Sequence, residues 1–291
     1  MPVAPLAGYA GFDSMVAHGG PGRYVLFGHP VSHSWSPFIN GLFARQFDHV
    51  VDYKLRDVEP VTFRGAVLEF FVEGGDGANV TLPHKTAAAE IVNELSARAE
   101  RARAVNTIIR RSSTELLGDN TDGAGLVTDL MSNLGVTISG SRLLVLGAGG
   151  AVRGVLAPLL EQEPREVRIA NRTPERARRL REEFSDLGEI SASSFDEVDD
   201  RPWDIVINAT AASLAGEVPA LPPRVIAHET VCYDMAYGRG DTAFMRWASE
   251  RGSSRSYKGW GMLVEQAAES YRLWHGVKPA TKPVLDALER L

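Results

Sequence analysis

Four short polar clusters interrupt an apolar background in the first half of the chain. They cover residues 28–37, 79–85, 104–107 and 118–123, and each follows or ends a candidate strand. Strand ends at one edge of an α/β sheet form the usual ligand crevice. The side chains that the clusters would bring together are the hydroxyls of Ser34, Ser36 and Thr81, the amide of Asn106, the ammonium of Lys85 and the carboxylate of Asp122. This set favours a small polyhydroxylated acid as the ligand.

Single members of these clusters also suit ordinary structural roles. Ser36 would make a good helix N-cap, and Asp122 would fit a turn. His29, His33 and His84 lie near one another in sequence, but their spacing and neighbouring carboxylates fit a zinc site poorly, so we expect no metal. The combination of residue types, rather than any one of them, indicates a ligand site.

A glycine-rich turn, Gly147-Ala148-Gly149-Gly150, lies between an apolar run and a predicted helix. Glycines permit a tight turn and let backbone N–H groups approach a pyrophosphate at the positive end of the helix dipole. The third position of the dinucleotide fingerprint holds Val152 instead of Gly or Ala, although Gly150 and Gly154 keep the turn open. This context favours dinucleotide binding over a merely tight strand–helix turn.

The residues after the next predicted strand indicate which dinucleotide binds. A site for NAD would place an acidic residue there for the ribose 2′-hydroxyl, whereas this chain reads Asn171-Arg172-Thr173. Arg172, with Arg176 one helical turn further on, offers guanidinium groups to a 2′-phosphate and no carboxylate to repel it. We therefore predict NADP. The alternative is a solvated basic helix face, which we expect for the arginines of residues 178–181.

The elements that must position these clusters alternate along the chain in the pattern of strands joined by crossover helices, so the predicted class is α/β. Short β-branched runs predict strands at residues 24–27, 50–55, 78–81, 105–109, 143–146, 167–170, 205–208 and 231–234. Amphipathic stretches predict helices at residues 37–47, 60–72, 86–98, 126–134, 151–160, 174–184, 261–275 and 284–290.

These elements indicate two domains, one of them discontinuous. The turn-rich segment 118–123 ends the first series of strands and helices, and we place a boundary there. We expect a flexible tail over residues 1–22 and a substrate-binding catalytic domain with a mixed sheet over 23–123 plus 260–291. A Rossmann-type, doubly wound NADP domain would cover 124–259.

Composition narrows the possible partners and the compartment. The 291 residues are 44% hydrophobic and carry a net charge of -6, which gives no basic surface for a nucleic acid. Cys232 is the only cysteine, so an internal disulfide is impossible, which suits a reducing cytoplasm. The start of the chain has no pattern of an export signal. The most apolar stretch, residues 143–160, contains Arg153 and four glycines, so we expect no membrane span.

The order of the motifs resembles the shikimate dehydrogenase family. After the four clusters and the glycine-rich turn come Asn171-Arg172-Thr173, Asn208-Ala209-Thr210, Tyr233-Asp234-Met235 and the segment 259–267, which reads GWGMLVEQA. The likeness runs from about Tyr24 to the C-terminus. It implies the reduction of 3-dehydroshikimate to shikimate with NADPH, a step of aromatic amino acid biosynthesis.

The resemblance also implies roles for three sets of residues. Lys85 and Asp122 correspond to the catalytic pair. The substrate contacts correspond to Ser34 and Ser36 at the carboxylate and to Thr81, Asn106, Tyr237 and Gln266 on the hydroxyl side. The cofactor positions correspond to Gly147, Ala148, Gly149, Gly150, Ala151, Asn171, Arg172, Thr173, Arg176, Met235 and Gly259.

The chemistry of the catalytic pair agrees with the implied reaction. Carbonyl reduction needs a hydride, which the nicotinamide supplies, and a proton donor at the oxygen that becomes an alkoxide. The ammonium of Lys85 can donate that proton. A carboxylate at Asp122 would favour the ammonium form, orient it and accept a hydrogen bond from a neighbouring substrate hydroxyl.

Three departures from the family pattern leave the substrate open. Ala211-Ala212-Ser213 stands where the family usually has a serine and a glycine near the nicotinamide, Trp35 is bulky between two serines, and Arg103 replaces a small residue. Arg103 also suits a helix-end cation. The alternatives are a dehydrogenase of quinate or a related cyclohexene acid that accepts NAD, and a non-catalytic sensor that binds the ligand without turnover. We expect a monomer or homodimer.

Overall fold

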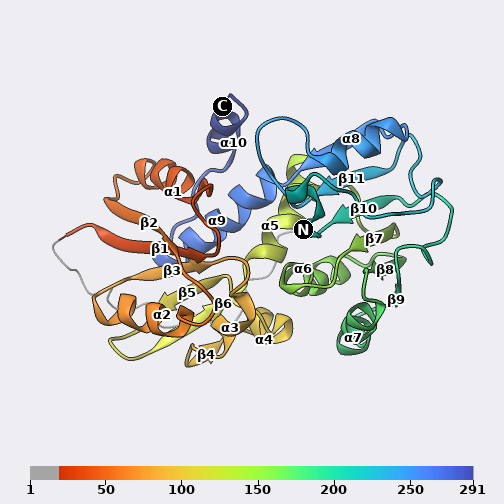
Figure 1. Cartoon of the computed structure of the whole chain (residues 1–291). Helices are drawn as coiled ribbons and strands as arrows, with labels where there is room; N and C mark the ends of the chain where they lie inside the picture. The colour runs from red at the N-terminus through yellow and green to blue at the C-terminus, as the bar shows by residue number, and fades with distance from the viewer. Residues whose placement is uncertain (1–19, 291) are drawn as a thin grey trace.

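Two α/β units lie side by side in the computed structural model, which describes residues 20–290 (Figure 1). The strands of the first unit come from residues 22–119 and those of the second from residues 142–258, and this confirms the predicted class. The expected tail, 1–22, falls outside the described residues as far as residue 19. Its last residue, Gly22, already belongs to the first strand.

The first unit contains a mixed sheet of six strands. Its elements are β1 (Gly22–Gly28), α1 (Ser36–Arg45), β2 (Val51–Asp57), α2 (Phe63–Val72), β3 (Gly77–Val80), α3 (Lys85–Ala89), β4 (Glu94–Leu95), α4 (Ala97–Ala102), β5 (Thr107–Arg110) and β6 (Leu116–Asp119). The strand order is β2-β1-β3-β5-β6-β4. Strand β1 runs parallel to β2 and β3, whereas β5 is antiparallel to β3 and β6.

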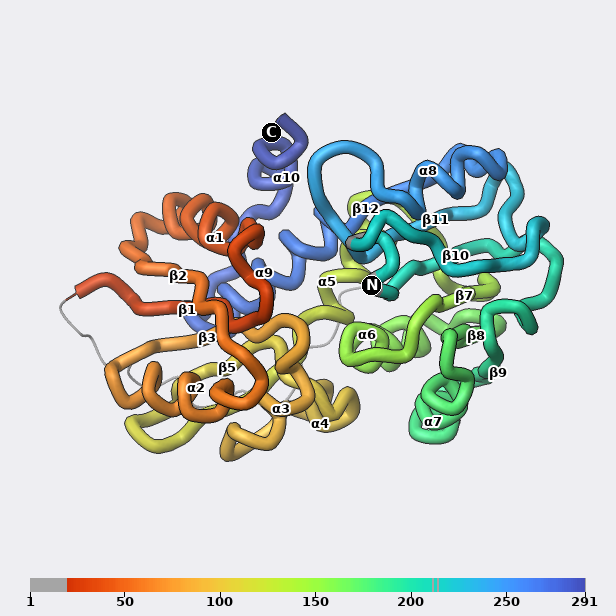
Figure 2. Tube along the Cα trace, in the orientation of Figure 1, coloured from red at the N-terminus to blue at the C-terminus, as the bar shows by residue number. Residues whose placement is uncertain are grey.

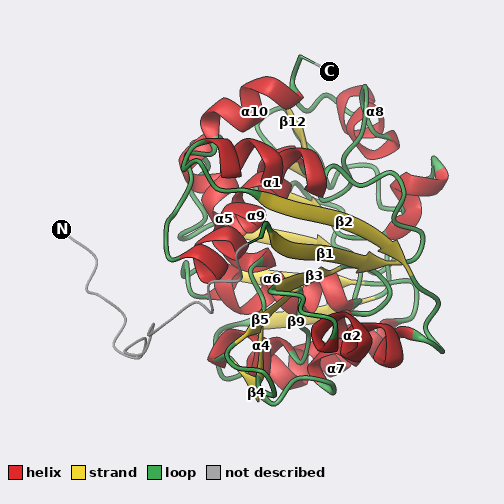
Figure 3. Cartoon of the chain, turned by 90° about the vertical axis from the view of Figure 1, so that its left-hand side faces the viewer, coloured by secondary structure: helices red, strands yellow, loops and turns green. Residues whose placement is uncertain are grey.

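Helices cover both faces of the first sheet. Phe63, Val67 and Phe70 of α2 pack on one face, together with apolar residues of α3 and α4. Helix α1 shares a second apolar cluster, which includes Phe43 and Tyr271, with α9 (Trp260–His275) and α10 (Lys282–Leu288). Figure 3 shows β1, β2 and β3 between these two groups of helices. The burial on both faces holds the strand ends, and therefore the polar clusters that follow them, in fixed positions.

The second unit contains an all-parallel sheet. Its elements and the helices around it are α5 (Asp122–Thr128) with a π-helical continuation (Asp129–Asn133), β7 (Arg142–Leu146), α6 (Gly150–Leu160), β8 (Glu166–Ala170), α7 (Pro174–Phe184), β9 (Ile190–Ser193), β10 (Ile205–Asn208), a 3-10 turn (Ala211–Ala215), β11 (Val231–Asp234), α8 (Ala243–Glu250) and β12 (Arg255–Lys258). Helices α9 and α10 follow β12 in the sequence and pack on α1 of the first unit.

The strand order of this sheet, β12-β11-β10-β7-β8-β9, is that of a doubly wound dinucleotide-binding fold. Every residue of β7, β10 and β11 is buried, as is typical of central parallel strands. The order reverses between β7 and β10, where a ligand crevice is expected. Helix α9 then leaves the second unit and returns to the first, as the blue tube in Figure 2 shows.

The structure corrects several predicted elements. The expected helix at 86–98 is wrong, because the chain forms α3, the short strand β4 and then α4. Ser96 prevents a single helix over this segment because its backbone is extended. Its hydroxyl accepts a hydrogen bond from the N–H of Ala99 and so caps α4. The first part of the turn-rich segment 118–123 belongs to β6.

Two edge strands and one helix start were also missed. Strands β9 and β12 lie at the two edges of the second sheet, and the alternation of apolar residues in them is weak. Helix α5 begins at Asp122, four residues earlier than the predicted start at residue 126. Among the described helices, none is long and apolar enough to cross a membrane.

Candidate active site

A cavity of about 380 Å³ lies where residues of the two units meet. Its walls contain all eight side chains expected to contact substrate, which are Ser34, Ser36, Thr81, Lys85, Asn106, Asp122, Tyr237 and Gln266. Three of the expected cofactor residues, Ala151, Met235 and Gly259, line it as well. Segments that are far apart in the sequence therefore contribute to one cavity beside the glycine-rich turn.

Lys85 and Asp122 form a direct ion pair in this cavity. The distance between Lys85 Nζ and Asp122 Oδ2 is 2.5 Å, and the two side chains are only 13% and 5% exposed. Each residue is the first of a helix, Lys85 of α3 and Asp122 of α5. The ammonium is thus held by a carboxylate that water can hardly reach, which strengthens their electrostatic interaction.

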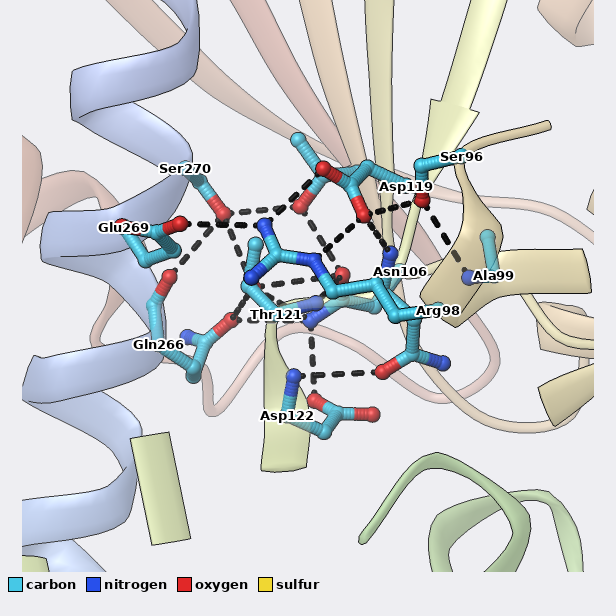
Figure 4. A network of polar contacts seen from close by, with 12 residues as sticks. Ser96, Arg98, Ala99, Asn106, Asp119, Thr121, Asp122, Gln266, Glu269 and Ser270 are labelled. Atoms are coloured by element: carbon cyan, nitrogen blue, oxygen red, sulfur yellow. Dashed lines mark hydrogen bonds and ion pairs between the residues drawn. The ribbon is translucent and has the colours of Figure 1, made fainter. Parts of the chain in front are cut away.

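The amide of Asn106 orients the carboxylate of Asp122. Asn106 Nδ2 donates to Asp122 Oδ1 at 2.9 Å and to Thr121 Oγ1 at 2.8 Å, and it lies 3.2 Å from Gln266 Oε1. In return, the backbone N–H of Thr121 donates to Asn106 Oδ1 at 2.8 Å. Figure 4 shows Asn106 among these partners. With one oxygen bonded to Asn106 and the other to Lys85, the Asp122 carboxylate has little freedom to rotate.

A buried ionic network lies next to this pair and fixes the chain that carries it (Figure 4). Asp119 accepts hydrogen bonds from Arg98 Nε at 2.6 Å and from the Ser96 hydroxyl at 2.5 Å. Arg98 also donates to Glu269 of α9 at 3.0 Å. Burial alone would raise the pKa of Glu269, but Arg272 and Arg98 lower it to about 2. The network ties α4, the end of β6 and α9 together, three residues before Asp122.

The hydroxyls of Ser34, Ser36 and Tyr237 gather at another wall of the cavity. Ser34 Oγ donates to Ser36 Oγ at 3.2 Å. Burial raises the pKa of Tyr237, and the Ser34 hydroxyl offsets part of that rise. Helix α1 begins at Ser36, Trp35 occupies the cap position, and no side chain caps the helix. The alternative role of Ser36 as an N-cap is therefore wrong. Its hydroxyl lies beside the N-terminus of a helix, where an anion is favoured.

Sequence reasoning missed Asn79, which also lines the cavity. Its amide donates to Ser270 Oγ at 3.1 Å and to the backbone carbonyl of Asn106 at 3.1 Å, and its Oδ1 accepts from the Tyr53 hydroxyl at 2.7 Å. Asn79 opens the cluster 79–85, so its position was singled out although its role was not. The contacts to Tyr53 and Ser270 carry no signal in the sequence.

The glycine-rich turn has the backbone that a dinucleotide site requires. Gly147 adopts a φ of +112°, which side chains with a Cβ rarely tolerate, and a Cβ there would also lie 3.1 Å from the carbonyl oxygen of Ala209. Helix α6 begins at Gly150, so its free N–H groups face the turn. Gly259, another expected cofactor residue, is also tightly packed: a Cβ there would lie 2.5 Å from the carbonyl oxygen of Met235. The residues present fit a bound pyrophosphate.

Arg172 and Arg176 lie outside the cavity at the end of β8 and on α7. Both are exposed, and within residues 20–290 neither guanidinium makes an ion pair. By contrast, Arg178 pairs with Glu175 at 3.1 Å, as expected of a solvated helix face. Asn171, just before Arg172, donates from its amide to the carbonyl of Thr173 at 2.9 Å and shapes the turn. Two unpaired cations at this strand end suit the 2′-phosphate of NADP.

The residues of the three departures from the family pattern do not line the cavity. Trp35 is not among the cavity residues and instead packs edge to face on Trp260, with 5.9 Å between the ring centroids. Arg103 is 73% exposed and ends α4 in a left-handed conformation, so it takes the role of a helix-end residue. Ser213 donates to Asp234 Oδ2 at 2.7 Å, which ties the turn after β10 to the end of β11.

Comparisons with known proteins agree with this geometry. The family models that match are described as shikimate dehydrogenase substrate binding domain (residues 26–108), shikimate / quinate 5-dehydrogenase (residues 129–216) and shikimate 5′-dehydrogenase C-terminal domain (residues 259–289). A curated relative named shikimate dehydrogenase (NADP(+)), from Methylococcus capsulatus, is 49% identical over 92% of this chain and 96% of its own length.

Two solved structures are similar over nearly the whole chain. One, an Ael1 enzyme from Pseudomonas putida, is 42% identical with a TM-score of 0.84 and covers 92% of this chain and 98% of its own. The other is a shikimate 5-dehydrogenase from Thermus thermophilus in complex with NADP(H) and shikimate. It is 32% identical with a TM-score of 0.81 and covers 92% of this chain and 99% of its own.

Proposed function

The chain belongs to the shikimate dehydrogenase family, and we propose that Lys85 and Asp122 are the pair of side chains with which it reduces 3-dehydroshikimate to shikimate. It is an oxidoreductase that uses NADP. The observation that carries the assignment of the pair is the 2.5 Å contact between Lys85 Nζ and Asp122 Oδ2 at the wall of the shared cavity.

Lys85 acts as the general acid of the reduction. Bound NADPH supplies the hydride that adds to the carbonyl carbon. The negative charge then develops on the carbonyl oxygen, and the Lys85 ammonium donates the proton that completes the alcohol. Lys85 regains its proton from water after product release. The nearby carboxylate of Asp122 favours the charged form of the amine, which is the form that can donate.

Asp122 and its neighbours orient the substrate ring. The Asp122 carboxylate accepts a hydrogen bond from a substrate hydroxyl next to the reacting carbonyl, while Asn106 keeps that carboxylate from rotating. Thr81 and Gln266 supply further polar contacts to the ring hydroxyls. At the other wall, the hydroxyls of Ser34 and Ser36 donate to the substrate carboxylate beside the N-terminus of α1. The resemblance places Tyr237 on the hydroxyl side, but Tyr237 contacts Trp260, which in turn contacts Trp35 between the two serines, so we propose that the Tyr237 hydroxyl also binds the carboxylate.

The cofactor lies along the second unit. Backbone N–H groups of residues 147–151 receive the pyrophosphate, and Arg172 and Arg176 bind the 2′-phosphate. Residues 23–123 plus 260–291 form the substrate domain and residues 124–259 the NADP domain. The two separate six-stranded sheets support this division, and so does the cavity, which residues from both units line. A biosynthetic role of this kind suits a cytoplasmic enzyme, which we expect to be a monomer or homodimer.

Absorbance at the nicotinamide band tests this function directly. The purified protein is mixed with shikimate and NADP, and the rise in absorbance from NADPH is followed; quinate and NAD are then substituted one at a time. We expect the fastest rise with shikimate and NADP. A faster rise with quinate and NAD would assign the alternative dehydrogenase, and binding of shikimate without turnover of any pair would assign the sensor.

A further inference from the structure

Three aromatic side chains from separate segments meet beside the wall that carries the hydroxyls. Trp260, the first residue of α9, contacts Trp35 edge to face, with 5.9 Å between ring centroids and planes at 79°. It also contacts Tyr237, with 5.0 Å between centroids and planes at 36°. We call Trp35, Trp260 and Tyr237 the aromatic bridge. All three are half-buried, and Trp35 and Trp260 also pack against the apolar cluster that α1, α9 and α10 share.

The aromatic bridge connects the two units at the point where they share the cavity. Trp35 lies between Ser34 and Ser36 on the first unit, whereas Tyr237 follows β11 on the second. Trp260 lies where the chain passes from β12 of the second sheet into α9, which packs on α1. Just before it, the backbone N–H of Gly259 donates to the carbonyl of Ala236 at 3.0 Å. The indole of Trp260 therefore contacts one residue from each unit.

The bridge reaches the cavity through Tyr237 and through Ser34, the chain neighbour of Trp35. Ser34 and Tyr237 both line the cavity, whereas Trp35 and Trp260 do not. The two tryptophans therefore contact or adjoin residues of the cavity wall without being part of it. Aromatic contacts of this kind are directional, and their favoured arrangements fix the distance and angle between the segments that carry the rings.

We propose that Trp260 is a positioning residue that, through its contacts with Trp35 and Tyr237, sets the separation of the Ser34 and Tyr237 hydroxyls and so the fit of the substrate carboxylate. This inference rests on the proposed function, since it concerns the same substrate. The carboxylate keeps its charge through the reaction, so its contacts are equally strong in ground and transition states. Loss of the bridge should therefore raise KM and leave kcat nearly unchanged.

The test compares Trp260→Ala and Trp35→Ala with a matched control. Each substitution should raise KM for shikimate about threefold to tenfold, the range that the loss of one or two aromatic contacts gives. We expect kcat and KM for NADP to change less than about twofold. Trp247→Ala is the control, because Trp247 is also half-buried and stacks on one aromatic ring, Phe244 at 5.4 Å, and neither residue lines the cavity.

Two further variants separate positioning from a general loss of stability. Trp260→Phe keeps an aromatic ring at the site and should restore most of the KM. In the double variant Trp35→Ala with Trp260→Ala, the KM increase should be clearly smaller than the product of the single increases, because both remove the same contact. Melting temperatures of all variants are measured alongside. Should Trp260→Ala fail to fold, Trp35→Ala and Trp260→Phe decide the question.

Wild-type turnover separates failure of this inference from failure of the proposed function. If the wild type does not oxidise shikimate, the proposed function is wrong and the inference falls with it. If the wild type is active but Trp35→Ala keeps its KM, or Trp247→Ala raises KM as much as Trp260→Ala does, only the positioning role is overturned. A fall in kcat with constant KM would likewise overturn it.

Discussion

The Lys85–Asp122 pair resembles an ordinary salt bridge in composition but not in surroundings. Exposed pairs such as Lys54–Asp52 are screened by water and contribute little. The pair in the cavity is nearly dry, and one of its partners is also held by Asn106. A substrate carbonyl that enters the cavity would find the ammonium already desolvated and oriented, so no reorganisation is needed at the moment of proton transfer.

Replacing Lys85 with Ala should therefore lower kcat by roughly 10²–10⁴, the usual contribution of a positioned general acid. Shikimate binding should weaken much less, because Asp122 and the three hydroxyls remain. Steady-state absorbance assays measure kcat and KM for shikimate. Lys54→Ala, which removes a lysine from an exposed pair, is the control and should be neutral. A kcat for Lys85→Ala within about threefold of the wild type would exclude Lys85 as the proton donor.

The cofactor preference depends on a second small set of residues. Arg172→Asp should shift the preference from NADP toward NAD, because it removes a cation from the 2′-phosphate and provides an acceptor for a 2′-hydroxyl. The loss of one charge-assisted contact should weaken NADP binding about 10- to 150-fold. Titration of cofactor fluorescence measures both affinities. Arg178→Ala, on the same helix but paired with Glu175, should leave the ratio unchanged; an unchanged ratio in Arg172→Asp would place the 2′-phosphate elsewhere.

At the scale of single residues, the sequence indicates the side chains that line the cavity better than those that hold them in place. Lys85 and Asp122 stand in short polar clusters whose residue types drew attention to them. Arg98 supports the site by joining Asp119, 21 residues away, to Glu269, 171 residues away, and both Arg98 and Glu269 look like ordinary surface charges in the sequence. No local pattern reports such a contact, because it exists only after three elements have packed.

Helix α1 gives the element-scale test of the hydroxyl wall. Ser36 begins the helix without capping it, so its hydroxyl contributes little to stability and is available to a ligand. Ser34→Ala and Ser36→Ala should each raise KM for shikimate about tenfold or more, since a hydrogen bond to a charged acceptor contributes roughly 1.5 kcal/mol or more. The melting temperature and KM for NADP should stay nearly constant.

A true cap elsewhere provides the contrasting control. Thr242 accepts a hydrogen bond from the N–H of Met245 at 3.2 Å and caps α8. Thr242→Ala should destabilise the protein by about 0.5–2 kcal/mol without changing KM for shikimate. Thermal melts and steady-state kinetics of the three variants distinguish the two roles. Earlier melting of Ser36→Ala with an unchanged KM would assign Ser36 to the helix rather than to the substrate.

The elements themselves were predictable to an uneven degree. Buried central strands such as β7 and β10 are short, nearly continuous apolar runs, which are easy to recognise. Their positions agree with the prediction to within a residue. Strand β4 has two residues and exists because it pairs with β6, which is distant in sequence. Edge strands such as β12 bury less apolar surface, so their sequences carry little alternation.

At the scale of the whole molecule, α9 joins the site to the stability of the fold. Its first turn carries Trp260, its middle carries Gln266 and Glu269, and its end packs His275 against the first sheet. A single helix therefore contacts the aromatic bridge, the cavity and the ionic network. Changes in packing at its far end can be measured separately, because the groups there are not part of the cavity.

His275 should make the protein lose stability in mild acid. Burial, together with the nearby charge of His49, lowers the pKa of His275 to about 4, and within residues 20–290 its buried Nε2 finds no hydrogen-bond partner. The unfolded chain binds a proton near the ordinary histidine pKa of about 6.5. The unfolded state is therefore favoured increasingly as the pH falls from about 6.5 to 4, by roughly 3 kcal/mol at the lower end.

Urea denaturation between pH 7 and pH 4 measures this contribution. His275→Phe keeps a ring beside Tyr271, 4.1 Å away in the native protein, but removes the titrating group, so its stability should fall less steeply over this range. His228→Gln is the control, because that histidine is 74% exposed, and it should follow the wild-type curve.

Glu269, whose pKa is lowered to about 2, stabilises the protein above its unfolded pKa and loses that effect only below about pH 4.5. Equal slopes for His275→Phe and the wild type between pH 6.5 and 4 would therefore show that the loss of stability in this window comes from groups other than His275.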